Sequence, residues 1–318
     1  MKNKKNIVLA LIAVIIYVVI FSLAQFGVLS RHTQSLLVPI GVNIILAVSL
    51  NLTVGFLGEL TLGHAGFMSV GAYAGCLFTI YCNLPVWIEF PLALIIGGLV
   101  AAIFGVIIGI PALRLNGDYL AIVTLAFGEI IRSVLNNVKF TGGAGGLKGI
   151  DKTSNFTIAY ILVILTLIVI TNVVRSRHGR AIMAIRDNII AAQSVGINIV
   201  YYKLVAFVGA AFFAGVAGVL YAHNLSMLKV SGFDYNMSIL ILVYVVLGGI
   251  GNLRGSMIAT IILYALPELL RGFANYRMLI YAIVLIVMML FNWAPAARNW
   301  RARTMEKIRG TKNKKEAA

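Results

Sequence analysis

The sequence predicts an all-α polytopic membrane protein, and three observations lead to that fold class. Hydrophobic residues make up 61% of the 318 residues and charged residues only 11%. The mean hydropathy is +0.98, and so few charges could not cover the exterior of a soluble protein of this length. The apolar residues also occur in long runs, and about 20 such residues span a bilayer as a helix.

The first apolar run, from 7 to 29, follows a basic N-terminus with the sequence MKNKK. This order of charge is typical of a secretory signal peptide. The run is too long for one, however, and no A-x-A cleavage site follows it. We therefore predict an uncleaved first transmembrane helix.

We predict about ten transmembrane helices along the chain. They lie at roughly 7–29, 36–57, 60–81, 89–110, 118–137, 157–174, 203–223, 236–250, 255–271 and 277–293. The whole chain, 1–318, is interpreted as a single transmembrane domain. Two of its segments stay in water, the loop 175–203 and the basic tail 294–318.

The basic residues predict which side of the membrane these segments occupy. Three lysines lie in the first five residues, five basic residues lie in 175–203, and eight lie between Arg298 and Lys315. An even number of helices places all three groups on one side, and the positive-inside rule makes that side cytoplasmic. The net charge of +16 does not indicate nucleic-acid binding, because the basic residues stand beside apolar spans.

Two predicted spans carry polar residues that are candidates for a substrate pathway. Asn43 and Asn51 are eight residues apart on one face of 36–57, and Glu129 precedes Arg132 by three residues in 118–137. Uncompensated charge is costly in lipid, so this pair should face the bundle interior, a partner subunit or the outer water layer. The alternative to a pathway role is an interfacial pair whose side chains snorkel to water.

The predicted span 60–81 has little side-chain bulk on one side. Gly71 and Gly75 form a GxxxG pair that allows a second helix backbone to approach closely, and 105 and 109 repeat the spacing. Close packing is the favoured interpretation of these glycines. His64, which follows Gly63 and precedes Gly66, is expected to be a hydrogen-bonded core residue, with a ligand or proton carrier as the alternative.

The glycine-rich sequence TGGAGGLKGID, residues 141–151, matches neither G-x-x-x-x-G-K-[ST] nor G-x-G-x-x-G. It falls on the predicted outer face, where no ATP is available, and is expected to be a flexible loop. The sequence contains no catalytic constellation and no metal-ligand spacing, and its two cysteines, Cys76 and Cys82, are expected to be free. We therefore expect neither an enzyme activity nor a bound metal or cofactor.

The loop 175–203 is the one large polar segment between predicted spans. Ala181 to Val195 is predicted to be one short amphipathic helix that Gly196 ends. Ala191 and Ala192 would permit close approach of a partner. Docking into a groove on a soluble protein is one interpretation, and an amphipathic connector lying on the headgroups is the other. The exposed charged or capping residues of this helix are expected to be Arg186, Asp187 and Asn188.

The second half of the chain contains short, glycine-interrupted hydrophobic segments. The predicted spans 236–250 and 255–271 are separated by GGIGNLRGS. Such segments are typical of a substrate pathway built at discontinuous helices, and they also arise from plain tight packing.

The segment 175–203 also resembles a known family. Its Ile190-Ala191-Ala192, followed after three residues by Gly196, matches the spacing of the EAA loop through which permease subunits of ABC importers engage their ATPases. The wider string GRAIMAIRDNIIAAQSVGIN closely resembles that loop in the M-type permease of branched-chain amino acid importers, the LivM family. The string GELTLGHAGFMSVGAYAG resembles a second block of the same family. In this chain the glutamate of the motif is Ile190, and the usual apolar-proline pair is absent.

This resemblance implies an all-α permease of the type shared with ribose-class importers, in the bacterial cytoplasmic (inner) membrane. The basic residues described above place both termini in the cytoplasm. The resemblance implies four kinds of partner: two ATP-binding cassette subunits that use the ATP, a second homologous permease, an extracytoplasmic substrate-binding protein and the lipid bilayer. Leucine, isoleucine and valine are the implied substrates. The implied ATPase-coupling residues are Arg186, Asp187, Asn188, Ala191, Ala192 and Gly196.

Three other classes of protein remain as alternatives. A sugar or nucleoside permease of the same fold has the same sequence pattern. An ion-coupled secondary transporter would need convergent intramembrane carboxylates, and only Glu129 comes near. A membrane-embedded enzyme or scaffold is disfavoured, because no catalytic residues are visible.

Overall fold

The computed structural model describes residues 14–293, except 16, 24, 27–29, 83, 116, 226 and 271–275. The predicted tail 294–318 and the beginning of the predicted first span lie outside the described residues. The chain forms two compact units, one that ends at Ile261 and one that begins at Ile262. Helices dominate both, and the strands in the described part have two residues each, which confirms the all-α prediction.

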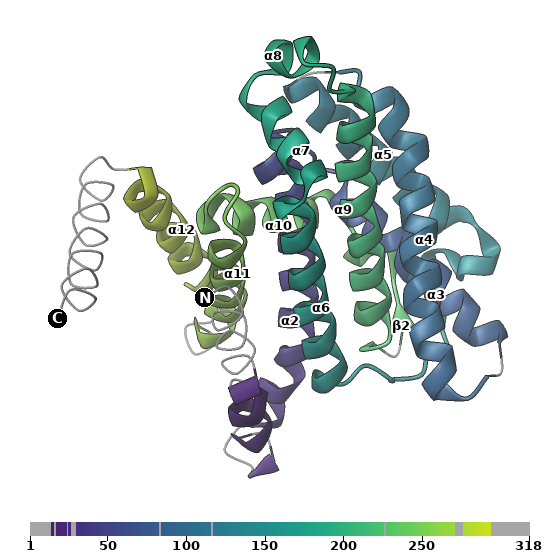
Figure 1. The fold of residues 1–318 in the computed structure, drawn as a ribbon. Helices are drawn as coiled ribbons and strands as arrows, with labels where there is room; N and C mark the ends of the chain where they lie inside the picture. Colours follow the sequence, from purple (N-terminus) through teal and green to yellow (C-terminus); the bar gives the residue numbers. More distant parts are fainter. Residues whose placement is uncertain are drawn as a thin grey trace. The chain divides into compact units, whose positions relative to one another are not determined.

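The helices follow one another along the chain, and short helices and strands lie in the longer connections (Figure 1). The first unit contains α2 (Arg31–Asn51), α3 (His64–Tyr81), α4 (Val86–Ala112), α5 (Asp118–Asn137), α6 (Phe156–Arg175), α7 (Arg177–Asp187), α8 (Ile189–Ser194), α9 (Ile199–Ala222) and α10 (Tyr235–Gly248). The helix α11 (Leu253–Leu269) begins in the first unit, and α12 (Arg277–Trp293) belongs to the second. Each predicted span from 36–57 onward corresponds to a helix.

Five helical segments of the described part are long and apolar enough to cross a membrane. They are Thr33–Leu57, Val86–Ala112, Phe156–Arg175, Ile199–Ala222 and Val230–Gly248. The predicted total of ten spans stays a prediction.

The centre of the first unit is the packing of α3, α4 and α9, and glycines make it possible. A methyl group on Gly71 of α3 would lie 2.2 Å from the Cα of Gly215 in α9. One on Gly97 of α4 would lie 2.7 Å from the carbonyl oxygen of Gly71. The backbones therefore approach too closely for any side chain at these points. The predicted role of the GxxxG pair is confirmed, since a methyl group on Gly75 would lie 2.5 Å from Val219.

Both cysteines, Cys76 and Cys82, are free, as expected.

The connection between α2 and α3 departs from regular helix. After α2 the chain continues as a π-helix, Leu52–Leu57, and then turns at Gly58, whose φ is +82°. Residues 58–63 are not helical, so α3 begins four residues later than predicted. Two backbone N–H groups of this connection have hydrogen-bond partners. The N–H of Leu62 donates to the Thr124 hydroxyl at 3.0 Å, and the N–H of Glu59 donates to the Thr53 carbonyl at 3.1 Å.

The glycine-rich loop forms regular turns and one strand. Two short 3₁₀ helices, Lys139–Thr141 and Gly143–Gly145, lead into β1 (Leu147–Lys148). This strand pairs antiparallel with β2 (Met227–Leu228), with Leu147 opposite Leu228. The sequence pattern did not predict this pairing between segments far apart in the chain. Within the first unit it lies toward the opposite end from α8 (Figure 1).

Candidate functional site

The loop predicted to dock a partner contains two helices, α7 and α8, and not the single helix predicted over 181–195. The break is at Asn188, whose φ of −159° and ψ of 107° are extended. The Asn188 side-chain oxygen accepts a hydrogen bond from the Ala191 backbone N–H at 3.0 Å and so caps the start of α8. Asparagine favours this local bond over continuing a helix, which is why the single-helix prediction is wrong.

The predicted stop at Gly196 is confirmed. Gly196 has a φ of +81°, its N–H donates to the Gln193 carbonyl at 3.0 Å, and the N–H of Ile197 donates to the Ala192 carbonyl at 3.1 Å. These two bonds form a Schellman cap, which satisfies carbonyls that would otherwise lack partners at the end of α8. The chain then turns directly into α9.

The inner face of α7 packs on the protein. Ile182 and Ile185 are each 1% exposed and belong to a cluster with Leu52, Phe56 and Leu57 of the π-helix, Ala206 of α9 and Ala192 of α8. An amphipathic connector on the headgroups would turn this apolar face to lipid. The observed packing disfavours that alternative and joins α7 to the end of α2.

Large apolar side chains on α8 and directly after it are left uncovered by the described residues. Ile190 is 80% exposed, Val195 is 75% exposed and Ile189 is 41% exposed. In Figure 1, α8 stands at one end of the first unit, beyond α7 and the start of α9. Large apolar side chains left exposed among polar residues are typical of a site where another protein docks.

Arg186 links the exposed loop to the buried part of the molecule. Its guanidinium donates to the Gly55 carbonyl oxygen of the π-helix at 3.0 Å. It also donates through Nε and Nη2 to one carboxylate oxygen of Asp187, at 3.1 and 3.0 Å. The side chain is exposed, as the sequence predicted, and its guanidinium is fixed by both partners.

The six predicted coupling residues all lie between the end of α7 and the turn that follows α8, but they differ in exposure. Asp187, Asn188, Ala191 and Gly196 are exposed, whereas Ala192 is buried against the protein. Their part in coupling to an ATPase stays a prediction. Lys203 differs from the expectation that the whole segment is in water, since it is 3% exposed and pairs with Glu59. Sequence reasoning did not single out Glu59, although an acid between two apolar runs needs a partner.

The two candidate pathway asparagines lie on α2 and have hydrogen bonds within the protein. The Asn51 side chain accepts from the Gly251 N–H at 2.9 Å and donates to the Ser256 hydroxyl at 2.8 Å. Asn43 donates to the Pro39 carbonyl at 2.9 Å. Asn51 therefore joins the end of α2 to the start of α11.

His64 and its neighbouring glycines lie where α3 begins. The His64 Nε2 atom and the Ser49 hydroxyl are 2.8 Å apart in a hydrogen bond, and the ring is 3% exposed. A methyl group on Gly63 would lie 2.7 Å from the Thr124 carbonyl oxygen, and one on Gly66 would lie 2.8 Å from the Cα of Gly128. These contacts favour a packed core histidine and close packing of α3 on α5 over a ligand role.

Glu129 and Arg132 form the predicted ion pair on α5, with a nitrogen–oxygen distance of 2.8 Å. The two side chains are about one-third exposed, 31% and 38%. The pair lies on a different helix from Asn43, Asn51 and His64. A pathway role for these residues stays a prediction.

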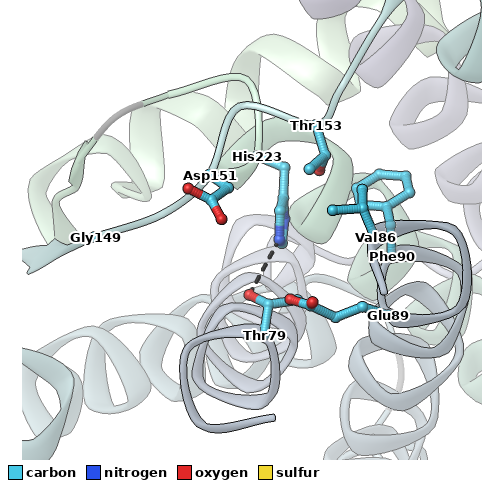
Figure 2. Close-up of a pocket in the computed structure, with 8 residues that line it drawn as sticks. All are labelled: Thr79, Val86, Glu89, Phe90, Gly149, Asp151, Thr153 and His223. Atoms are coloured by element: carbon cyan, nitrogen blue, oxygen red, sulfur yellow. Dashed lines mark hydrogen bonds between the residues drawn. The ribbon is translucent and has the colours of Figure 1, made fainter. Parts of the chain in front are cut away.

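A small polar recess lies at the other end of the first unit (Figure 2). The Thr79 hydroxyl and His223 Nε2 are 3.2 Å apart there, and Glu89 and Asp151 also line the recess. His223 directly follows the end of α9 and is 1% exposed. None of the predicted site residues lines it. Across the described residues, no group of three or more His, Cys, Asp or Glu side chains could hold a metal ion.

Comparison with known proteins gives a consistent result. The family described as branched-chain amino acid transport system / permease component matches residues 32–291. The high-affinity branched-chain amino acid transport system permease protein LivM of Salmonella typhimurium is 36% identical over 324 residues, covering 91% of this chain and 75% of that protein. The LivM protein of Escherichia coli is 36% identical, covering 88% and 73%. The ribose import permease protein RbsC of Haemophilus influenzae is 27% identical, covering 88% and 90%. No solved structure matches the chain.

Proposed function

This chain belongs to the family of branched-chain amino acid transport permeases, and we propose that it is a membrane subunit of an ATP-driven importer for leucine, isoleucine and valine. It is a multi-pass membrane protein of a transport family that is not itself enzymatic. In our proposal the chain binds no cofactor, and two separate ATP-binding cassette subunits use the ATP. The complex lies in the bacterial inner membrane, with both termini of this chain in the cytoplasm.

The observation that carries the proposal is the exposed apolar patch on α8. Ile190 and Val195 would be unfavourable in water if nothing covered them, yet they stand on an ordered helix with defined caps at both ends. Such a preformed helix suits a groove on a soluble partner, because little ordering entropy is lost on binding. The ATPase is that partner in our proposal.

A second permease subunit would cover the outer side of α5. Tyr119, Ile122 and Ile130 are exposed on this helix, together with the partly exposed Glu129–Arg132 pair. A charged pair facing lipid is costly, whereas a subunit interface or a wet pathway would accommodate it. An extracytoplasmic binding protein completes the proposed complex at the end that carries β1 and β2.

The substrate proposal rests on the family and on the chemistry of the buried side chains. The buried polar residues are mostly serine, threonine and asparagine, and the buried ion pair Glu59–Lys203 is satisfied within the chain. A cationic or phosphorylated solute would need complementary charges. Ribose is the second candidate, because ribose permeases are similar over most of the chain.

Purification of the complete complex tests the assembly. We expect this chain to retain two ATPase subunits and a second permease, and we expect leucine-loaded binding protein to stimulate ATP hydrolysis. A chain that purifies without an ATPase and transports leucine alone would contradict the proposal and would favour a secondary transporter.

A further inference from the structure

The non-helical junction between α2 and α3 is held by two basic residues from a different part of the chain. Arg186 of α7 donates to the carbonyl oxygen of Gly55 at 3.0 Å. Four residues later, the carboxylate of Glu59 forms an ion pair with Lys203 of α9. Two points of the loop 175–203, one at the end of α7 and one near the start of α9, are therefore attached to the same short segment, 55–59.

Two glycines leave room for these attachments. A methyl group on Gly58 would lie 2.6 Å from Cγ of Arg186, and the φ of +82° at Gly58 also disfavours any other residue. A methyl group on Gly55 would lie 1.7 Å from the side-chain oxygen of Asn51 and 2.4 Å from the backbone nitrogen of Gly251. The segment therefore lies directly against the Arg186 side chain of α7 and against the backbone of the turn before α11.

The Glu59–Lys203 pair is almost completely removed from water, with side-chain exposures of 11% and 4%. A buried charge without its partner is strongly unfavourable. The two side chains should therefore stay together when their surroundings move, so that Glu59 follows α9. A pair with no mechanical role could be replaced by apolar side chains without loss of function.

The segment leads directly to the start of α3 and to α5. Leu62, three residues after Glu59, donates to the Thr124 hydroxyl of α5, and Gly63 lies against the Thr124 carbonyl. His64 then begins α3 with its hydrogen bond to Ser49. A displacement of 55–59 would thus reach α5, the helix that carries Glu129.

From these contacts we propose that Glu59 and Lys203 are positioning residues for transport. Together with Arg186 they clamp segment 55–59 to α7 and α9, so that a movement of α7–α8 by an ATPase shifts the junction of α2 and α3 and, through it, α5. This inference rests on the proposed function, because an ATPase bound at α8 supplies the movement.

The test compares uptake with ATP hydrolysis in the complete complex, reconstituted in proteoliposomes with binding protein and leucine. The main variant is the double change Glu59→Gln with Lys203→Met, which leaves no unpaired buried charge. We expect it to keep its ATPase subunits and to hydrolyse ATP at a rate within about twofold of the unaltered complex. Leucine uptake per ATP should fall by roughly tenfold, which lies within the usual range of coupling between sites.

A charge-swapped variant, Glu59→Lys with Lys203→Glu, keeps an ion pair at the same place and should recover uptake per ATP at least in part. The matched control is Tyr17→Phe with Thr157→Val, which removes a different polar link, of 3.0 Å, outside α7–α9. It should leave uptake per ATP unchanged.

Normal uptake per ATP in the assembled double-neutral variant would overturn the inference. If that variant does not assemble, a charge-swapped complex that assembles with a normal thermal stability but stays uncoupled would overturn it as well. Failure of the proposed function would be seen in the unaltered complex, as uptake that does not depend on ATP. The two failures are therefore distinguishable.

Discussion

Arg186 and Gly55 are 131 residues apart in the chain, and a hydrogen bond of 3.0 Å joins the guanidinium of one to the carbonyl oxygen of the other. This contact connects the exposed helices α7 and α8 to the buried junction of α2 and α3. Membrane insertion alone does not require such a connection. Through this hydrogen bond, a partner bound to α8 could change the position of α2 and α3.

The proposed cytoplasmic location of the loop 175–203 predicts which positions react with a membrane-impermeant thiol reagent. In a variant without Cys76 and Cys82, a cysteine at the exposed position Ser194 should not be labelled in intact cells and should be labelled after lysis. A cysteine at Lys148, which is exposed near the opposite end, is the control and should be labelled in both cases. Efficient labelling of position 194 in intact cells would refute a cytoplasmic loop.

Ile190→Arg should weaken ATPase binding without affecting the stability of the permease. The side chain is 80% exposed, so the change removes no internal packing. Burying a charge at the centre of an apolar interface should cost about 2 kcal/mol or more, which is typical of an interface hot spot. The amount of co-purified ATPase measures the effect, and Ile190→Val is the conservative control. Unchanged retention of the ATPase in the arginine variant would argue against docking on α8.

Gly196→Val should disturb the end of α8 through the backbone alone. The φ of +81° is unfavourable for an L-residue by about 1–2 kcal/mol, and no neighbouring atom would contact the new Cβ. Hydrogen exchange of the α8 amides should become faster, and uptake per ATP should fall. Gly196→Asn tolerates this conformation better and should have a smaller effect. Equal exchange rates in the two variants would show that the Schellman cap is not important.

Gly71→Leu should prevent the packing of α3 on α9. Its Cβ would lie 2.2 Å from the Cα of Gly215, and backbone cannot move aside as a flexible side chain can. The cost should exceed the usual 1–3 kcal/mol of overpacking, because two helices must separate. Gly209→Ala is the control, since its Cβ would meet only Leu52, at 3.6 Å. Thermal unfolding in detergent compares the two, and similar midpoints would contradict the packing described here.

The sequence predicted the helices well because hydropathy and helix length are local properties. The bounds of α5 and α12 coincide with the predicted 118–137 and 277–293, and the glycine pairs correctly indicated close packing. The local pattern also located the loop 175–203 and the helix end at Gly196.

The features that the sequence did not predict depend on contacts between distant residues. Glu59 and Lys203 are 144 positions apart, and the ladder between Leu147 and Leu228 joins two short loops. The break at Asn188 was missed for a different reason, because the apolar spacing continues across it and only the asparagine side chain favours a new cap.

Uptake of labelled leucine by proteoliposomes that hold the whole complex tests the central claim most directly. The liposomes contain ATP or a non-hydrolysable analogue, and the binding protein is added outside, with ribose and glutamate as control solutes. We predict leucine uptake that requires both ATP and the binding protein, with isoleucine and valine as competitors. Leucine uptake that persists without ATP, or uptake of ribose in place of leucine, would contradict the account.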